Sequence, residues 1–206
     1  MIMEKVKGTL THRQRQALAT RQLIVEAACE LFLAQGYLAT TIEAISARAG
    51  VAVSTVYAVF RNKRGILQAI RERWHQESGQ REIYQQAREQ SDPKRRLVLA
   101  AHATRRQWET GSVMMTIYQA AAAADPDAAA ELANALQGRR TFLTQFIDEM
   151  ADQLSPGLSP TRAVSLFYTL TQPTIYQDIV FGEGWNADEY EAWLAETLQQ
   201  QLLPTS

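Results

Sequence analysis

The sequence is poor in the features that mark secreted and membrane-spanning proteins. Cys29 is its one cysteine, so no intramolecular disulfide can form. Its apolar runs fall well short of the roughly 18 residues that read as a membrane span. Residues 1–21 are mostly polar and contain no apolar core followed by a small-residue cleavage site. We therefore expect a cytoplasmic protein in a reducing compartment, without a secretory signal and without membrane contact.

Signatures of catalysis and of metal binding are also missing. The chain contains no phosphate-loop pattern, no G-x-S-x-G and no H-E-x-x-H. The histidines at positions 12, 75 and 102 do not stand at metal-ligand spacing with Cys29. The segment Gly182-Glu183-Gly184 is too short to be a dinucleotide fingerprint. We predict no enzymatic activity, no cofactor and no metal; turnover of a bound small molecule would revive the enzyme alternative.

The formal net charge of -1 hides an uneven distribution of charge along the 206 residues. Residues 1–70 contain 9 Lys and Arg against 4 Asp and Glu, whereas residues 107–206 contain 3 against 13. A basic N-terminal half joined to an acidic C-terminal half suggests that only one end of the molecule meets a polyanion. The alternative is a chance distribution of solvated charges. With 46% hydrophobic residues, the chain is long enough to bury a real core.

The residue pattern predicts helices almost throughout, because no run alternates apolar and polar residues as a strand does. Capping residues stand directly before proline in Asp92-Pro93, Asp125-Pro126 and Ser159-Pro160. Asn186 has an acid three residues later, close to a capping box. Pro173 should kink or split its helix. We expect an all-α fold with about nine helices, at residues 20–35, 40–49, 53–59, 63–89, 93–109, 112–123, 126–153, 160–181 and 187–202.

Residues 20–60 hold the most informative pattern. An amphipathic helix ends at Gly36, and its apolar face comprises Ile24, Ala27, Ala28, Leu31 and Phe32. Thr40 and Glu43 form a capping box for a second helix, which stops at Gly50. A third helix begins at Val53, only a short turn later. Two short helices joined by such a glycine-containing turn form a helix-turn-helix, here at about residues 40–60.

The third helix suits the major groove of DNA, which is about 12 Å wide. Its exposed residues include no acid that would repel phosphate: Val53, Ser54, Thr55, Tyr57 and Ala58. Hydroxyl groups suit phosphate oxygens, while Val53 and Ala58 suit thymine methyl groups. The helix start at Thr40 offers free N–H groups to a phosphate. Arg61, Lys63 and Arg64 extend the basic surface.

Five short motifs lie within residues 36–67: Gly36-Tyr37, Thr40-Thr41-Ile42, Ala49-Gly50-Val51, residues 54–60 (STVYAVF) and residues 62–67 (NKRGIL). Together they resemble the N-terminal domain of the TetR family of bacterial transcriptional regulators. The resemblance implies two domains. Residues 1–66 would form a basic arm and a three-helix helix-turn-helix domain, and residues 67–206 a helical domain for effector binding and dimerisation.

The resemblance also implies roles for single residues. Thr40 and Lys63 match phosphate-contacting positions, and Thr41 belongs to the same predicted surface. Thr55 and Tyr57 match positions that touch the DNA backbone. The remaining predicted contacts, which fall at base-facing positions, are Val53, Ser54 and Ala58.

Two positions depart from the family pattern. Ala52 stands at the cap of the third helix where serine is frequent, which weakens that cap by about 1 kcal/mol. Ala58 stands where a larger residue is frequent, so direct readout there is limited to a methyl contact and we expect DNA shape to share in specificity. Upstream, four basic residues form either an arm that reaches the minor groove or a solvated tail: Lys5, Lys7, Arg13 and Arg15.

The last two predicted helices, residues 160–181 and 187–202, look like the family's dimer interface. Stripes of mainly apolar residues at helical spacing run along both, at Ala163, Leu166, Phe167, Leu170 and Thr174, and at Tyr190, Trp193, Leu194, Thr197, Leu198, Gln201 and Leu202. A homodimer also has an independent reason. Two-fold pairing places two recognition helices about one DNA turn apart on a palindromic operator.

The region between is expected to hold a small-molecule pocket. Its predicted lining comprises His102, Arg105, Trp108, Met114, Tyr118, Phe146, Phe167, Thr171, Gln172 and Tyr176, with Met115, Phe142 and Tyr168 as further candidates. Each of these residues is alternatively plain core. Because this part of the chain is acidic and rich in aromatic residues, we expect a small lipophilic effector that is neutral or cationic.

These features predict a sequence-specific repressor, nucleoid-associated while bound to its operator. The effector would release it by shifting the helix that follows Lys63, which requires that the effector binds one conformation better than the other. Two alternatives stay open. One is a transcriptional activator of the same family, and the other is a DNA-binding protein without sequence specificity.

Overall fold

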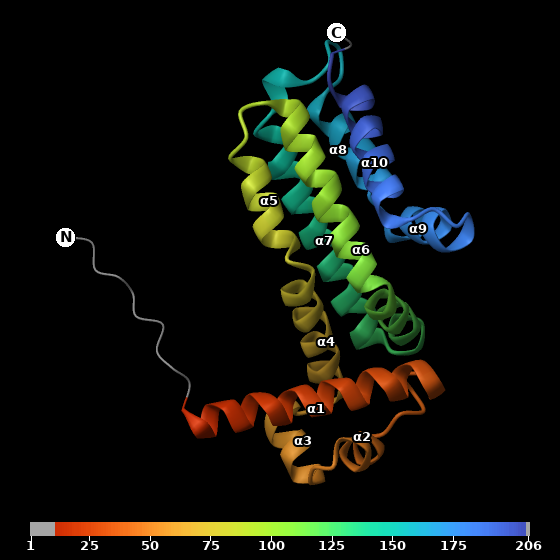
Figure 1. Ribbon diagram of the computed structural model, residues 1–206. Coiled ribbons are helices and arrows are strands. Elements are labelled where there is room, and N and C mark those ends of the chain that lie inside the picture. The colour runs from red at the N-terminus through yellow and green to blue at the C-terminus, as the bar shows by residue number, and fades with distance from the viewer. Residues whose placement is uncertain (1–10, 205–206) are drawn as a thin grey trace, which may run out of the picture. The chain divides into compact units, whose positions relative to one another are not determined.

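The computed structural model describes residues 11–204, and all regular structure in that range is helical (Figure 1). The predicted all-α fold is confirmed, with ten α-helices within the described residues where about nine were expected in the chain. The chain divides into two compact units, of which the first ends at Ile70 and the second begins at Arg71. Helix α4 (Lys63–Ser78) contributes to both units. The predicted domain boundary between residues 66 and 67 lies slightly earlier in the same helix.

The first unit contains α1 (His12–Gln35), α2 (Ile42–Ala49), α3 (Val53–Phe60) and the start of α4. Its core is formed by apolar side chains spaced along these helices, including Ile24, Phe32, Ile45, Val56, Phe60 and Ile66. Burial of each large aliphatic or aromatic side chain contributes on the order of 1.5–3 kcal/mol. The three short helices are therefore held together by one small apolar cluster.

Helix α1 begins earlier than the pattern indicated. Thr11 and Gln14 form a capping box at its start, so the helix includes Arg13 and Arg15. The prediction of an arm or tail at these two residues was wrong, because their segment has its own helix-start signal. Lys5 and Lys7 lie outside the described residues.

The cap of α2 also differs from the prediction. Thr41 is the N-cap, and its hydroxyl accepts from the backbone N–H of Ala44 at 3.1 Å. Thr40 is fully buried; its hydroxyl donates to the carbonyl of Gly36 at 2.8 Å and accepts from Gln35 Nε2 at 3.2 Å. Thr40 therefore closes the turn between α1 and α2 instead of capping α2.

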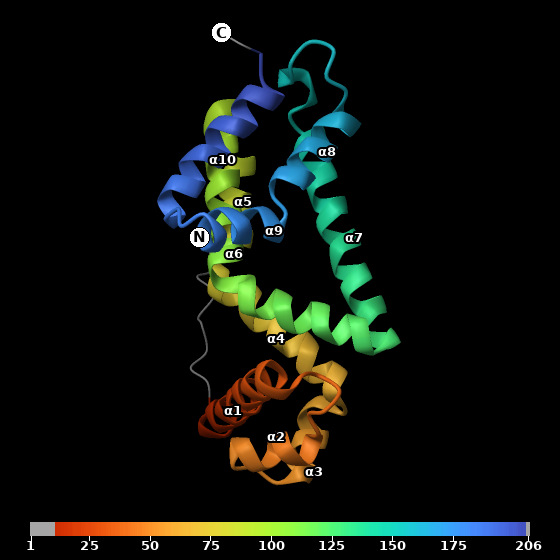
Figure 2. The same cartoon turned by 90° about the vertical axis from the view of Figure 1, so that its right-hand side faces the viewer.

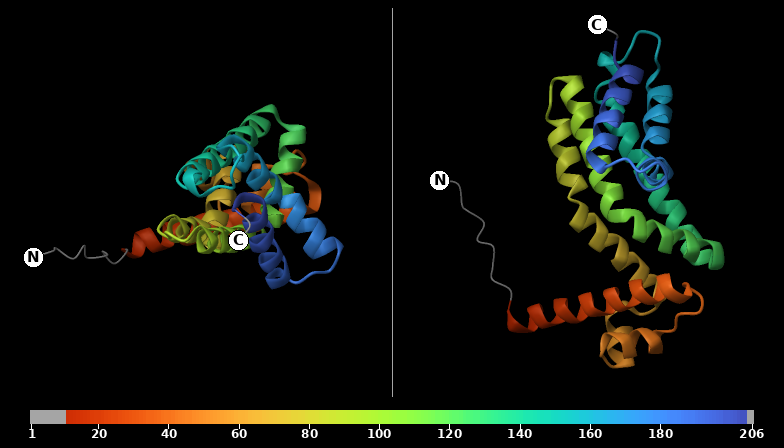
Figure 3. Two further views of the ribbon diagram at one scale, coloured as in Figure 1. Left: turned by 90° about the horizontal axis from the view of Figure 1, so that it is seen from above. Right: turned by 45° about the vertical axis from the view of Figure 1, so that its right-hand side comes forward.

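The second unit continues from α4 through α5 (Gln80–Arg88), α6 (Pro93–Ala124), α7 (Pro126–Asp148), the 3₁₀ turn η1 (Ala151–Gln153), α8 (Pro160–Leu170), α9 (Pro173–Tyr176), the π-helix η2 (Gln177–Gly182) and α10 (Ala187–Leu202). The four predicted caps are confirmed at Asp92, Asp125, Ser159 and Asn186. Figures 1 and 3 show α10 beside α6, its principal packing partner.

Three further predicted helices have different bounds in the structure. Residues 63–89 form two helices, because Gly79 adopts a left-handed conformation at φ +62° that ends α4. The helix predicted at 126–153 ends at Asp148. The segment at 160–181 is split before Pro173, as expected, and continues as the short α9 and the π-helix η2.

Helix α6 is continuous where a break was predicted between residues 109 and 112, and Figure 2 shows that it bends along its length. Gly111 lies inside it because α4 leaves no room for a larger residue. A Cβ added at Gly111 would lie 2.2 Å from Nε1 of Trp74. The same Nε1 donates to the carbonyl of Gln107 at 2.8 Å. Gly111 therefore allows α4 and α6 to pack closely, and it does not end a helix.

An ionic network that includes one buried arginine joins three helices of the second unit. Glu149 after α7 pairs with Arg88 of α5 and, at 2.6 Å, with Arg96 of α6. Arg96 is only 5% exposed and also donates to the carbonyl of Phe146 at 3.1 Å. The two guanidinium groups hold the pKa of Glu149 below its ordinary value. A paired charge of this kind is tolerated in a core where an unpaired one is costly.

Within residues 11–204, no single helix combines the length and the apolar composition that a membrane span needs. Helices α2 and α3 meet that test only when counted together, and they are bent by 108° relative to each other.

The Gly111→Ala variant is expected to unfold more easily than the parent protein. Overpacking against Trp74 should cost about 1–3 kcal/mol, more than the roughly 1 kcal/mol that alanine gains over glycine in a helix. Urea denaturation measures the difference. The control is Gly138→Ala in α7, where nothing lies within 4 Å of the added Cβ, and a small gain in stability is expected. An equal gain in the free energy of unfolding in both variants would show that the packing of Trp74 does not require glycine at position 111.

Candidate nucleic-acid interface and effector cavity

Helices α2 and α3 meet at the angle of a helix-turn-helix. The angle between the two helices is 108°, within the range of about 90–120° that is typical of the motif. Gly50 ends α2 in the left-handed region at φ +68°, and the hydroxyl of Ser46 donates to the carbonyl of Val51 at 2.6 Å. The predicted turn is therefore present, with a hydrogen bond that fixes its geometry.

The five residues predicted on α3 lie on its accessible side. Tyr57 is 47% exposed, and Ser54 and Ala58 are exposed, while Val53 and Thr55 are partly buried. Val59, which was not predicted, is also exposed. Ala52 makes no side-chain cap, as expected. No acidic residue lies on α3, so its outer surface offers hydroxyl and methyl groups without repelling phosphate.

Lys63 occupies a different place from the one predicted. Its ammonium donates to the carbonyls of Tyr37 at 2.8 Å and Thr40 at 2.9 Å, and it lies 4.6 Å from the centre of the Tyr37 ring. These partners belong to the turn between α1 and α2, so Lys63 fastens α4 to that turn. Thr40 is buried, whereas Lys63 is half-buried and its ammonium is bonded to carbonyls of the same turn. Thr41 remains exposed at the start of α2.

The turn between α3 and α4 depends on Arg61, Asn62 and Gly65. Arg61 adopts φ +64°, which is uncommon for a residue with a side chain. Asn62 accepts from the backbone N–H of Gly65 at 2.9 Å. A Cβ added at Gly65 would lie 2.1 Å from the carbonyl oxygen of Phe60. The turn therefore requires glycine at position 65, and it leaves Arg61 and Arg64 exposed beside α3.

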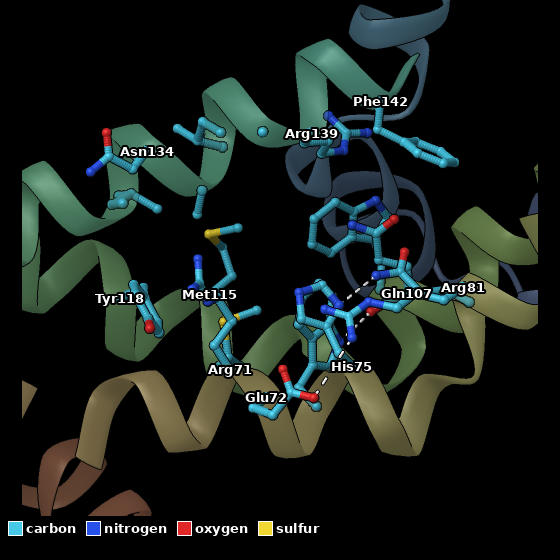
Figure 4. Close-up of a pocket in the computed structure, with 18 of the residues that line it drawn as sticks. Arg71, Glu72, His75, Arg81, Gln107, Met115, Tyr118, Asn134, Arg139 and Phe142 are labelled. Carbon is cyan, nitrogen blue, oxygen red and sulfur yellow. Dashed lines mark hydrogen bonds and ion pairs between the residues drawn. The ribbon is translucent and has the colours of Figure 1, made fainter. Parts of the chain in front are cut away.

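A cavity of about 440 Å³ lies within the second unit, between side chains of α4, α5, α6 and α7. This volume falls in the range of small-molecule sites. Figure 4 shows Arg71, Glu72 and His75 on α4, across the cavity from Arg139 and Phe142 on α7. The walls are mainly apolar and aromatic, with the Trp74 and Trp108 rings stacked at 6.0 Å.

The predicted lining is only partly correct. Trp108, Met114 and Tyr118 line the cavity, as do Met115 and Phe142. His102 and Arg105 instead pair with Glu191 and Asp188 of α10. The other predicted residues lie elsewhere in the packed unit: Phe146, Phe167, Tyr168, Thr171, Gln172 and Tyr176. Helical periodicity identifies inward-facing residues, and it does not separate a cavity wall from a packed core.

The α4 wall of the cavity was missed by the sequence analysis. Arg71, Trp74 and His75 recur at helical spacing on that wall. This helical spacing was the feature of the sequence that could have identified the α4 wall. On α7, Arg139 was also missed. Its Nη2 donates at 2.6 Å to both the carbonyl and the hydroxyl of Thr171.

The ionisable groups of the cavity are mostly neutralised. Arg71 pairs with Glu131 at 3.3 Å, and Arg81 pairs with Glu72 at 3.6 Å. Burial and the neighbouring Arg81 and Arg71 lower the pKa of His75 to about 4, so its ring is neutral near pH 7. In the range that the structure covers, no cluster of His, Cys, Asp and Glu is arranged to hold a metal ion.

The Lys63→Met variant should destabilise the first unit. Loss of an ammonium that bonds two turn carbonyls is expected to cost about 1.5–3 kcal/mol, measured by urea denaturation. The salt dependence of DNA binding should keep its slope, because the ammonium is already engaged within the protein. Unchanged stability with a slope reduced by about one would place Lys63 on a phosphate instead.

The pKa of His75 predicts a loss of stability in acid. The unfolded chain binds a proton at His75 below its ordinary pKa of 6.5, whereas the folded protein does so only near 4. The free energy of unfolding should therefore fall as the pH decreases through this window. In His75→Gln, denaturation curves collected at about pH 7 and about pH 5 should differ less than in the parent protein. An equal difference in both proteins would contradict the shifted pKa.

Comparison with known proteins agrees with the geometry of the first unit. Residues 24–70 match the model of the family described as bacterial regulatory proteins, tetR family. A stretch of 55 residues is 44% identical to the uncharacterized HTH-type transcriptional regulator TtgW of Pseudomonas putida. That match covers 27% of this chain and 41% of the relative's length.

Two solved structures share the fold over most of the chain. The SmeT–triclosan complex has a TM-score of 0.72 at 23% identity, covering 90% of this chain and 92% of SmeT. NalD, the secondary repressor of the MexAB-OprM multidrug efflux pump in Pseudomonas aeruginosa, has a TM-score of 0.71 at 24% identity, covering 92% and 98%. The chain is therefore similar to the tetR family of bacterial regulatory proteins over residues 24–70 and shares the fold of these two proteins over most of its length.

Proposed function

We propose that the protein is a transcription regulator that binds DNA through α3. The observation that carries this proposal is the pair of short helices bent by 108°, with an acid-free outer face on the second helix. Such a helix enters the major groove and reads base edges, while the preceding helix crosses the backbone. Ser54 and Tyr57 supply hydroxyl groups, and Val53 and Ala58 supply methyl groups.

The proposal extends to repression and to release by a small molecule. NalD is a repressor, and SmeT has been solved with triclosan; both share the fold of this chain. The cavity in the second unit has the volume and the apolar walls of a small-molecule site. The protein's part in this scheme is binding and not catalysis.

A homodimer completes the proposal. Much of the stripe predicted on α10 is used within the protomer, since Tyr190, Leu194, Leu198 and Leu202 are buried there. What remains partly exposed is Leu166 and Leu170 on α8 and Trp193 and Thr197 on α10. We assign the dimer contact to these smaller apolar patches, since two-fold pairing would present two α3 helices to a palindromic site.

Helix α4 provides the route from effector to DNA. Its first residue, Lys63, is bonded to the turn between α1 and α2, and its later residues Trp74 and His75 line the cavity. A ligand that binds better when α4 is displaced would stabilise a conformation with a different position of α3. Release from DNA then follows from this difference in affinity.

Selection of binding sites from a random DNA pool at physiological salt tests the proposal. The expected product is a palindrome with half-sites about one turn apart. In the same assay, Ser54→Ala should change the preferred sequence, and Tyr57→Phe should weaken binding evenly across sequences. Retention of DNA without a consensus would favour nonspecific binding, and failure to retain any DNA would contradict the proposal.

A further inference from the structure

Arg139 differs from every other charged group on the cavity wall. Its guanidinium lies 5.6 Å from the centre of the Trp108 ring and 4.9 Å from that of Tyr168. Nη2 has two neutral acceptors on Thr171, and the buried Nη1 has no hydrogen-bond partner. Burial lowers the pKa of Arg139, but an arginine side chain stays protonated in proteins. No carboxylate from residues 11–204 pairs with it.

The remaining charges of the wall do not compensate Arg139. Glu72 is paired with Arg81, and Arg71 is paired with Glu131. His75 is neutral, and Gln80 Nε2 lies 2.7 Å from its Nδ1. Among the described residues, Arg139 is therefore the charged group of the wall for which no counter-charge is supplied.

Two other arginines of the second unit, one buried and one partly buried, differ from Arg139 in having carboxylate partners. Arg96 packs on the Phe146 ring at 4.7 Å, as Arg139 packs on aromatic rings, but Arg96 has Glu149 at 2.6 Å. Arg105 likewise has Asp188 at 3.2 Å. An unpaired buried charge is costly. Its persistence in a cavity wall indicates that a bound molecule supplies the partner.

We propose that the cavity binds a monoanionic, amphipathic organic carboxylate whose carboxylate pairs with Arg139. The inference rests on the proposed function, in which this cavity receives the effector. A guanidinium matches a carboxylate through two parallel N–H···O bonds. One uncompensated charge suits a monoanion, and the apolar walls disfavour a multiply charged, strongly hydrated molecule.

The other wall residues determine which non-polar part of a ligand fits the cavity. The stacked rings of Trp74 and Trp108 provide a flat aromatic surface. Met114 and Met115 add flexible apolar groups that adapt to different shapes. A planar aromatic carboxylate fits both features. Because Nη1 is covered by protein atoms, the anion reaches it only when a wall side chain moves, which couples binding to a change of conformation.

The assignment reverses the charge expected from the sequence. The acidic composition of residues 107–206 favoured a neutral or cationic effector. The acids near the cavity, Glu72 and Glu131, are taken up by Arg81 and Arg71, so the composition of the region does not describe the field inside the cavity.

The test compares two probes of nearly equal shape, 2-naphthoate and its amide, by calorimetric titration of the full-length protein without DNA. The parent protein should bind the carboxylate about ten- to a hundredfold more tightly than the amide, the value of a buried hydrogen bond to a charged group. In Arg139→Gln this ratio should fall toward one while the affinity for the amide is retained. In the control Arg162→Gln, at an exposed position of α8 that does not line the cavity, the ratio should not change.

Three outcomes would overturn the proposal: equal affinities in the parent protein, tighter binding of the amide, or an unchanged ratio in Arg139→Gln. Binding of neither probe at millimolar concentration would also overturn it. Circular dichroism checks that Arg139→Gln is folded, and Arg139→Lys, which keeps the charge but loses the two-pronged geometry, should give an intermediate ratio. Selection of DNA sites is measured separately, so failure here leaves the proposed DNA-binding function standing, and the reverse also holds.

Discussion

The contact between Trp74 and Gly111 is the constraint on which the second unit depends. The indole occupies the space that any side chain at position 111 would fill, and its N–H bonds the carbonyl of Gln107 on the same helix. Trp74 also stacks on Trp108 and forms part of the cavity wall. One contact therefore fixes the spacing of α4 and α6 and shapes the cavity between them. A molecule that presses on this wall necessarily acts on the packing of α4.

Local signals were sufficient to predict the helix-turn-helix and insufficient to predict the cavity. The glycine at position 50 and the spacing of buried residues on α2 and α3 are properties of short segments, so they are visible in the sequence. The placement of the Lys63 ammonium was not, because it depends on carbonyl groups of a turn more than twenty residues away. Gly111 shows the same limit: a helix-breaking residue was tolerated because Trp74, far along the chain, fills its space.

Two arginines with buried guanidinium nitrogens illustrate how the fold treats charge. Arg96 joins α6 to Glu149 and so stabilises the bundle at the ends of α5 and α7. Arg139 is held by neutral groups and aromatic rings alone. Replacing a fully packed apolar residue with an arginine that has no partner lowers stability. An arginine that lowers stability is expected at a position where the side chain serves ligand binding and not folding.

Lys63 explains why a movement at the start of α4 must affect the turn between α1 and α2. If the start of α4 were tied to the rest of the first unit by apolar packing alone, a small displacement could be absorbed by side-chain rearrangement. The ammonium instead bonds the carbonyls of Tyr37 and Thr40, which are fixed in the backbone between α1 and α2. The hydroxyl of Thr40 in turn bonds the carbonyl of Gly36 at the end of α1. Because directional bonds resist sliding more than apolar contacts do, a shift of α4 moves this turn, and with it the start of α2.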